Sequence, residues 1–260
     1  MSGCRIESEG GVGVAEQTRD GIRLNKYVAD SGFCSRREAD RLIERGQVTV
    51  DGRVGVLGDR ILPGMDVRVD GQRLDDAAEK VYIALHKPAG IVCTTAPREP
   101  LNVIAYLNHP GRVFPIGRLD KDSSGLLLLT SDGEIVNRVL RAAGRHEKEY
   151  IVSVDRKLTP EFLRAMASGV PILDTVTLPC RIEKLTDFSF RLVLIQGLNR
   201  QIRRMCEALG YRVRSLRRVR VMHIELGGLQ AGHWRDLTER ELTDLFSTLY
   251  EEQGDEPEIP

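Results

Sequence analysis

The amino-acid sequence predicts an α+β protein, in which a small αβ unit precedes a larger unit built on a mixed, largely antiparallel sheet. The chain has 260 residues, of which 41% are hydrophobic and 29% charged, so it can form a sizeable core in one large and one small domain. Helix-like and strand-like periodicities follow one another without the strict order of repeated βαβ units. A stretch with few large apolar groups, residues 70–80, separates two regions of regular pattern.

Composition and charge suggest five segments along the chain. We expect a disordered tail over 1–21, a small unit over 22–69, a linker over 70–80, a large unit over 81–250 and an acidic disordered tail over 251–260. The net charge is zero, but residues 22–69 hold 9 basic and 7 acidic residues, and residues 81–245 hold 25 and 18. Two basic bodies between acidic segments are typical of a chain that binds a polyanion.

The same inventory excludes several classes of protein. The longest apolar runs have five residues, far short of the roughly 20 that a membrane span needs. The five cysteines are scattered and odd in number, which predicts reduced thiols and no zinc site. We therefore expect a cytoplasmic monomer with no membrane association.

Two helices are predicted at the start of the small unit. Helical spacing begins at Leu24, and Gly32 ends this first helix. Ser35 and Glu38 form a capping box, which begins a second helix that Gly46 ends. Three arginines recur along it at every fourth position and form one ridge: Arg37, Arg41 and Arg45. The spacing alone does not distinguish a ridge that binds a partner from an ordinary solvated helix face.

Strands follow, and with them a resemblance. Residues 47–52 predict a strand entering a tight Asp-Gly turn, with further strands at 53–56 and 66–69. The small-Gly-Phe turn, the Ser-Arg helix start, Leu-Ile before Gly and a Val-x-Val-x-Gly strand resemble an S4-type RNA-binding domain. The resemblance implies that the second helix and the loop before it face an RNA backbone. The residues it places there are Lys26, Arg36, Arg37 and Arg41.

In the large unit, strand and helix patterns alternate. Strand-like runs lie at 81–85, 91–94, 126–130, 149–154, 188–195, 212–216 and 219–226. Helices fit 134–143, 161–168, 200–209 and 239–250. Thr159 followed by Pro160 is a helix start, and Thr238 with Glu241 forms a second capping box.

One loop of this unit stands out for its polar residues. Gly117 and Gly125 bound the sequence GRLDKDSSG, which leads into four leucines that predict a buried strand. Site residues tend to lie on loops at the mouth of such rigid supports. Asp120 and Asp122 lie two apart in this loop. An Asp-rich turn that closes a hairpin is the simpler interpretation from composition alone.

A second candidate is the helix at 200–209. Its apolar residues recur at i, i+3, i+4 and i+7 from Ile202. The helical phase places Arg203 at the edge of this stripe, half-buried, and Arg200 and Arg204 on the exposed side. Eight arginines and one acid lie between Asn199 and Arg220. This density favours nucleic-acid contact over a merely solvated face.

Tyr150 begins a predicted strand that follows a run of charged residues. The simpler interpretation is a structural role, with the ring in the core and the hydroxyl held by a hydrogen bond. The five histidines show no metal-ligand spacing, and no phosphate-binding glycine loop occurs. We therefore expect neither a metal nor a cofactor.

Four motifs in order resemble the RsuA/RluB/RluE/RluF group of pseudouridine synthases, which carry an N-terminal S4 domain. They are His-Lys-Pro-x-Gly at 86–90, Gly-Arg-Leu-Asp with its leucine strand, Lys-Glu-Tyr at 148–150, and Asn-Arg-Gln-Ile-Arg-Arg-Met at 199–205. The finer match is to the RluF branch. The resemblance implies isomerisation of a uridine in ribosomal RNA, of the large subunit, with a stem-loop in free or assembling RNA as the substrate.

The resemblance also implies roles for residues. Asp120 matches the catalytic carboxylate, Arg203 the arginine that pairs with it, and Tyr150 the tyrosine that stacks on the base. Leu216 matches an apolar residue that lines the uracil site. Four basic residues are expected to contact the substrate strand: Arg118, Lys121, Arg200 and Arg204.

The sequence leaves three alternatives open. The chain could be a catalytically silent binder that assists ribosome assembly. It could perform the same chemistry on tRNA or small-subunit ribosomal RNA. It could also be a hydrolase that uses Asp120 and Asp122 as a carboxylate pair, which requires both side chains to face one cleft.

Overall fold

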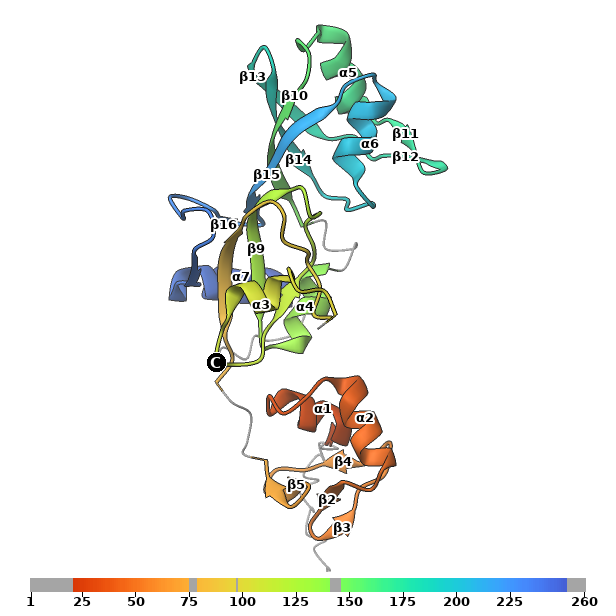
Figure 1. The fold of residues 1–260 in the computed structure, drawn as a ribbon, viewed down its shortest axis with the longest axis vertical. Helices are drawn as coiled ribbons and strands as arrows, with labels where there is room; N and C mark the ends of the chain where they lie inside the picture. The colour runs from red at the N-terminus through yellow and green to blue at the C-terminus, as the bar shows by residue number, and fades with distance from the viewer. Residues whose placement is uncertain (1–20, 75–78, 97, 141–145, 252–260) are drawn as a thin grey trace, which may run out of the picture. The chain divides into compact units, whose positions relative to one another are not determined.

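The computed structural model describes residues 21–74, 79–96, 98–140 and 146–251, which belong to two compact units, 1–76 and 77–260 (Figure 1). Apart from Gly21 and Glu251, the predicted tails over 1–21 and 251–260 lie outside the described residues.

The N-terminal unit packs two helices against short strands. Helices α1 (Leu24–Asp30) and α2 (Arg36–Glu44) contact each other. A four-stranded sheet has the order β3-β2-β5-β6, with β2 at Val48–Val50, β3 at Arg53–Val54, β5 at Val67–Val69 and β6 at Gln72–Arg73. A separate antiparallel pair joins β1 (Ile22–Arg23) to β4 (Arg60–Ile61). The inward faces of these elements form one apolar core.

Local signals in the sequence explain these elements. The Ser35 hydroxyl accepts a hydrogen bond from the Glu38 backbone N–H at 3.1 Å and so caps α2. The Glu38 carboxylate instead binds Arg41 at 2.9 Å. Asp51 and Gly52 both have positive φ, +48° and +79°, as the predicted two-residue hairpin turn requires.

The linker that the sequence analysis places at 70–80 begins too early. Asp70 and Gly71 form a second tight turn, with φ of +49° and +80°, and β6 follows it. Leu74 is buried in the core of the N-terminal unit. The composition of this stretch is polar because β6 is an exposed edge strand, and one buried leucine is enough to attach it. Residues 75–78 lie outside the described part of the chain.

The C-terminal unit is built on a sheet of nine strands within the described residues. The order is β13-β14-β10-β15-β9-β7-β17, with β16 on β15 and β8 on β9. Only β15 and β9 pair in parallel, through Arg217 with Ser124 and Arg218 with Gly125. The strand bounds are β7 Tyr82–Lys87, β8 Phe114–Ile116, β9 Ser124–Thr130, β10 Lys148–Val154, β13 Arg181–Thr186, β14 Ser189–Leu194, β15 Val213–Val221, β16 Ile224–Glu225 and β17 Trp234–Asp236. The sheet is therefore mixed and largely antiparallel, as the sequence predicts.

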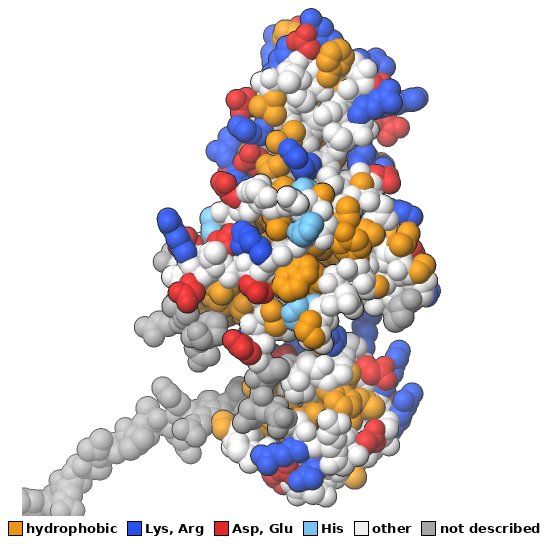
Figure 2. Space-filling model, turned by 60° about the vertical axis from the view of Figure 1, so that its left-hand side comes forward, with side chains coloured by type: hydrophobic (Ala, Val, Ile, Leu, Met, Phe, Trp, Pro, Cys, Tyr) orange, Lys and Arg blue, Asp and Glu red, His pale blue; other side chains and the backbone are white. Residues whose placement is uncertain are grey.

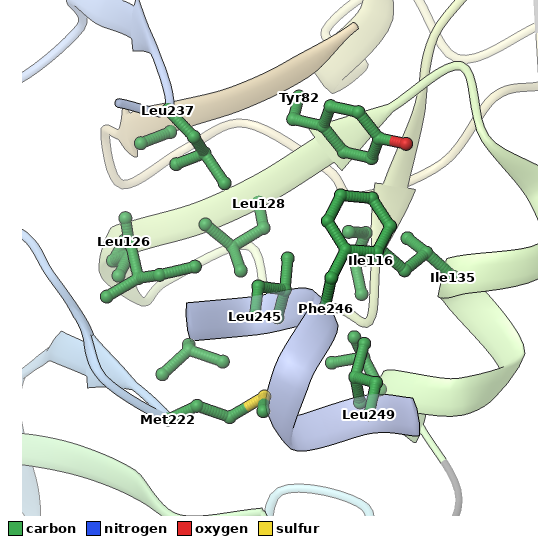
Figure 3. Packing of buried hydrophobic residues seen from close by; sticks show 14 of the residues in the cluster. Tyr82, Ile116, Leu126, Leu128, Ile135, Met222, Leu237, Leu245, Phe246 and Leu249 are labelled. Carbon is green, nitrogen blue, oxygen red and sulfur yellow. The ribbon is translucent and has the colours of Figure 1, made fainter. Parts of the chain in front are cut away.

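Helices cover the two halves of this sheet separately. On one half, α4 (Gly133–Leu140) and α7 (Glu239–Glu251) share a core with β7 and β9, and α3 (Val103–Leu107) packs on the opposite face. Figure 3 shows Leu245 and Phe246 of α7 beside Leu128, and the Phe246 ring meets Tyr82 edge-on at 5.7 Å. On the other half, α5 (Pro160–Ser168) and α6 (Gln201–Ala208) cover β10, β14 and β15. The two halves meet where β15 pairs with β9.

Two strand predictions were wrong. Residues 91–94 form no strand but a single bridge between Val92 and Asn102. Residues 212–216 and 219–226 were predicted as two separate strands. They form one strand, β15, because the buried Arg218 bonds to a neighbouring backbone, and Met222 then turns the chain into β16. Five further strands and one helix of this unit were not predicted: β8, β13, β17, β11 (Pro171–Ile172) with its hairpin partner β12 (Thr175–Val176), and α3.

The basic excess does not form one continuous patch on the face that Figure 2 presents, where basic and acidic side chains are interspersed. No helix within the described residues is long and apolar enough to cross a membrane.

Candidate active site

The polar loop at 117–123 connects β8 to β9. Some of its side chains are buried and hold the loop in place, and others are accessible to solvent. Leu119 is buried in the core beside α3, and its backbone N–H donates to the Cys93 sulfur at 3.4 Å. Ser123 is also buried, and its N–H bonds the Asp120 carbonyl at 3.1 Å. The Asp120 side chain between these anchors is 30% exposed. The loop therefore holds this carboxylate at a fixed place without burying it.

A buried lysine supports the loop from below. Lys87 is fully buried at the end of β7, and its ammonium donates to the carbonyls of Pro88 and Ile91, each at 2.8 Å, and of Lys121 at 3.4 Å. The Gly90 N–H also bonds the Lys121 carbonyl, at 2.7 Å. Burial lowers the pKa of Lys87. Because Lys121 directly follows Asp120, these bonds fix the backbone beside the carboxylate.

Two arginines approach Asp120 from α6 and its start. Arg203 Nε and Arg200 Nη1 each lie 3.7 Å from Asp120 Oδ2, an ion-pair distance longer than a hydrogen bond. Arg203 also donates from Nη2 to the Asp122 carbonyl at 3.0 Å and the Ser123 hydroxyl at 3.1 Å. Its side chain is 14% exposed, against 42% for Arg200. The helical phase therefore placed Arg203 correctly beside the core.

Of the other two arginines of this cluster, Arg200 agrees with the expectation and Arg204 differs from it. Arg200 is exposed, as expected, and it precedes the helix with φ of +50°, a turn that brings its guanidinium within ion-pair distance of Asp120. Arg204 was expected to be exposed, yet it is half-buried. Its guanidinium folds back onto Asn199, with Nε donating to the carbonyl at 3.1 Å and Nη2 to the side-chain oxygen at 3.3 Å.

The sheet supplies the floor of the site. Tyr150 on β10 is half-buried and contacts two of the apolar cores. Its partner across the ladder to β15 is Arg218. Arg218 is only 3% exposed, and its Nε donates to the Leu126 carbonyl at 2.7 Å. Lys148, two residues before Tyr150, donates to the His146 carbonyl at 3.0 Å. Burial, and then the charge of Arg218, lower the pKa of Lys148.

A single cleft of about 920 Å³ joins these groups. Six residues that the sequence analysis singled out line it: Arg118, Asp120, Tyr150, Arg200, Arg203 and Leu216. Lys121 and Arg204 are not among its lining residues, and Lys26, Arg36, Arg37 and Arg41 belong to the N-terminal unit. Asp120 is the only carboxylate among the described residues that line the cleft. Its volume is within the range of small-ligand sites.

Comparisons with known proteins identify the family. Residues 81–208 match the family described as RNA pseudouridylate synthase, and residues 22–67 match the S4 domain. The dual-specificity RNA pseudouridine synthase RluF of Escherichia coli K12 is 54% identical over 230 residues, which cover 88% of this chain and 79% of the relative. The chain belongs to the RNA pseudouridine synthase family. As a member of this family, it is an isomerase that acts on RNA.

Two further relatives of this pseudouridine synthase agree with the fold. The ribosomal large subunit pseudouridine synthase B of Bacillus subtilis is 35% identical, covering 86% of this chain and 95% of the relative. A crystal structure described as a pseudouridylate synthase is 29% identical, with a TM-score of 0.63, over 86% of this chain and 100% of that chain. An S4 domain followed by a pseudouridine synthase domain is therefore the architecture of the chain.

Three residues at or beside the pseudouridine synthase site were not predicted from the sequence. Lys87 and Lys148 stand in motifs that were quoted, but neither was singled out, and Arg218 was read as one of many surface arginines. Strand alternation holds a signal for Lys148, because residues two apart on a strand share a face with Tyr150. No comparable signal marks Arg218. Within the described residues, no group of His, Cys, Asp and Glu that could hold a metal ion occurs.

Proposed function

We propose that this pseudouridine synthase converts a uridine of large-subunit ribosomal RNA to pseudouridine, with Asp120 as the catalytic carboxylate. The observation that carries the assignment is the solitary position of Asp120 among the described cleft residues, facing Arg200 and Arg203. Asp122 is 65% exposed and does not line the cleft, which counts against a carboxylate-pair hydrolase.

The chemistry requires such a group. Uracil is detached from C1′, rotated and rejoined through C5, and the carboxylate either adds to C1′ or removes a proton from C2′. Either route develops positive charge on the sugar, which a fixed carboxylate stabilises in a site that excludes water. Arg203 and Arg200 would keep Asp120 aimed at the sugar, and Arg203 does so through a backbone carbonyl of the same loop as well.

Tyr150 and Leu216 are proposed to hold the base. The half-buried Tyr150 ring and the buried Leu216 both line the cleft, on adjacent strands of its floor. We assign Tyr150 to stack on the uracil and to assist removal of the C5 proton. The target base has to leave its stack to reach these residues, at a cost of a few kcal/mol.

The remaining basic residues are proposed to bind the RNA backbone. Arg200 and Arg118 lie at the cleft, and Lys121 and Arg204 lie beside it on the same two segments. In the S4 domain, Lys26 and the exposed arginines of α2 would contact phosphates: Arg36, Arg37 and Arg41. We propose that the enzyme acts in the cytoplasm as a monomer, without a cofactor.

The choice of ribosomal RNA is supported by the name of the Bacillus relative, which specifies the large ribosomal subunit. The relatives at 54% identity are named dual-specificity enzymes, so a second RNA has to be tested. Mapping pseudouridines by carbodiimide adduct stops in cells with and without this protein separates large-subunit RNA, small-subunit RNA and tRNA. Loss of sites confined to tRNA or the small subunit would contradict the proposal.

The catalytic assignment is tested by two matched substitutions. Asp120→Asn keeps the shape and removes the charge, so the fold and RNA binding should survive while turnover falls below detection. Asp122→Asn should keep substantial activity, because that side chain is 65% exposed and is not among the residues that line the cleft. Conversion of uridine in a ribosomal RNA fragment, at RNA concentrations well above Kd, compares them. Near wild-type conversion by the Asp120 variant, or loss of activity in the Asp122 variant alone, would show that Asp120 is not the catalytic carboxylate.

A further inference from the structure

Arg218 is a buried cation whose hydrogen bonds are incomplete. It is 3% exposed, and its Nε donates to the Leu126 carbonyl at 2.7 Å. Its Nη2 is buried and has no hydrogen-bond partner among the described residues. A buried guanidinium donor without a partner is costly for the folded protein. Because Arg218 lines the active-site cleft, a bound substrate can provide the missing acceptor.

The structure maintains this arrangement at a special point of the sheet. Arg218 lies where β15 pairs with β9 in parallel, opposite Gly125. Gly125 has φ of +107°, and a Cβ built on it would lie 2.1 Å from the Arg218 carbonyl oxygen. Only glycine allows the two backbones to approach this closely. The backbone that carries Arg218 is therefore held directly behind the loop that carries Asp120.

Lys148 adds a second cation on the same floor. It lines the cleft, and within the described part of the chain its ammonium has one hydrogen bond, to the His146 carbonyl. Among the residues that the structure describes, neither Lys148 nor Arg218 forms an ion pair with a carboxylate. Their mutual repulsion contributes to the lowered pKa of Lys148. Two cations held together without an acid favour a site for negative charge.

We propose that Arg218 and Lys148 bind the carbonyl oxygens of the target uracil and stabilise the base as an anion after it leaves C1′. This inference rests on the proposed function, in which Asp120 marks the position of C1′. When the N1–C1′ bond breaks, its electron pair departs with the base, and the negative charge spreads over N1 and both carbonyl oxygens. C5 then bonds to C1′, the C5 proton is removed and N1 takes up a proton, so the reaction remains an isomerisation.

Depth in the cleft favours the base over a phosphate as the ligand. The backbone of a flipped nucleotide stays continuous with its strand, so its phosphates remain at the mouth of the cleft, and its base reaches furthest in. Arg200, whose side chain is 42% exposed, is accessible to phosphates. Arg218, which lies beside Tyr150 and is 3% exposed, is the donor suited to the deepest part of the nucleotide.

Substitutions test the roles of the two cations. Arg218→Met should slow single-turnover conversion of a ribosomal RNA fragment by roughly 100- to 1,000-fold. Lys148→Met should slow it by at least about tenfold, and neither change should alter the Kd for RNA by much. Arg218→Lys should restore part of the rate. Arg217→Met is the matched control, because the exposed Arg217 is absent from the cleft lining and should leave the rate unchanged. Thermal unfolding checks that each variant folds. If Arg218→Met does not fold, Lys148→Met still tests the proposal.

Two substrate analogues distinguish the base from a phosphate. A 5-fluorouracil target is a better leaving base, so Arg218→Met should lose less in the rate of N1–C1′ cleavage on this RNA than on the normal one. A methylphosphonate at the target nucleotide removes its phosphate charge, and its effect should multiply with that of Arg218→Met. Equal losses on both bases, or a methylphosphonate effect that disappears in the variant, would overturn the proposal, the latter in favour of a phosphate contact.

The outcome is separable from that of the proposed function. If Asp120→Asn abolishes conversion while folded Arg218→Met and Lys148→Met proteins react at the wild-type rate, only the anion site is refuted. If Asp120→Asn remains active, the assignment of the cleft itself fails.

Discussion

At the scale of single residues, the two arginines that reach Asp120 are not equivalent. Both have a nitrogen 3.7 Å from the carboxylate. Arg203 is also tied to the loop by hydrogen bonds to the Asp122 carbonyl and the Ser123 hydroxyl, whereas no hydrogen bond from Arg200 to the loop accompanies its ion pairs. Arg203 can therefore position Asp120, and Arg200 can adjust its contact when RNA arrives.

We predict that Arg203→Ala affects both chemistry and stability, while Arg200→Ala affects mainly binding. Loss of the Arg203 bonds leaves buried Ser123 and a loop carbonyl without their donor, which should cost about 1–3 kcal/mol of unfolding free energy. Turnover at saturating RNA should fall more in Arg203→Ala than in Arg200→Ala, and least in Arg204→Ala, which should mainly weaken RNA binding. Equal turnover in the three variants would contradict this ranking.

The resemblance of the motifs to a known family implied that Asp120, Tyr150, Arg203 and Leu216 belong to one site, and all four line the cleft. Helical phase also gave the burial of Arg203, because an apolar stripe fixes which side of a helix faces the core. The same reasoning placed Arg200 correctly on the exposed side, but it failed for Arg204, which is half-buried because its guanidinium folds back onto Asn199. It failed for Arg218 because a charged residue in an arginine-rich strand gives no sign that its side chain turns inward.

At the scale of elements, the parallel pairing of β9 with β15 joins the two halves of the sheet. It consists of two residue pairs, and Gly125 occupies one of them. A Cβ at this position would meet the Arg218 backbone at 2.1 Å and 2.6 Å, and backbone atoms cannot move aside as a flexible side chain can. The junction of the two halves therefore depends on a single glycine.

We predict that Gly125→Ala destabilises the protein by about 4 kcal/mol or more, or prevents folding. Both the positive φ and the backbone clash act against the new methyl group. Gly228→Ala is the matched control, because a Cβ there has nothing within 4 Å. Urea unfolding measures both variants. A loss in Gly125→Ala no larger than in the control would contradict the role assigned to this junction.

A capping box begins α7, and it was predicted from the spacing of Thr238 and Glu241. The Glu241 N–H donates to the Thr238 hydroxyl at 3.2 Å, and the Thr238 N–H donates to the Glu241 carboxylate at 2.9 Å. Arg235 of β17 donates two bonds of 2.7 Å to the same carboxylate. These bonds, with Arg235 first and the Thr238 N–H next, lower the pKa of Glu241 to about 2.

We predict that this carboxylate makes the stability of the enzyme depend on pH in acid. Because its pKa is lower in the folded state, its contribution is fully present above the unfolded value of about 4.3 and is lost as the pH falls toward about 2. Solvent screening reduces the contribution to roughly 1–2 kcal/mol. The difference in unfolding free energy between wild type and Glu241→Gln should therefore shrink between pH 6 and pH 3. Glu239→Gln, in the same turn, is the control, and a difference for Glu241→Gln that is constant with pH would contradict the prediction.

Elements with strong local signals were predicted well, and those held by tertiary contacts were not. Caps and periodic apolar residues located α2, α5, α6 and α7 to within a few residues. The short strands β8 and β17 carry no such pattern, because each is an edge or partner strand that is held by pairing to β9 or β7. Residues 91–94 have strand-like composition, but they bond to the loop before α3 and therefore form no ladder.

At the scale of the whole molecule, each unit has a core of its own. Among the described residues, the apolar cluster of the N-terminal unit lies between Leu24 and Leu74, and the three clusters of the catalytic unit contain no residue before Val81. All of the described residues that line the cleft belong to the catalytic unit. The S4 domain is therefore expected to add affinity and selection for RNA, but no catalytic group.

We predict that a truncated enzyme beginning at residue 77 folds and isomerises a short RNA weakly. Removing the S4 domain removes phosphate contacts, including those expected of the exposed α2 arginines, so RNA affinity should fall. Each lost contact should also make the dependence of log K on log salt shallower by about 0.7–0.9. Filter binding across a salt series gives both quantities, and single-turnover conversion at saturating RNA gives the rate of chemistry.

The full chain with Arg36, Arg37 and Arg41 changed to Gln is the matched control, because it keeps the domain and removes only its charge. If truncation left the affinity and the salt slope unchanged, the S4 domain would have no part in binding. If the truncated enzyme folded but lost all conversion at saturating RNA, the N-terminal unit would have to contribute to the reaction itself and not only to RNA binding.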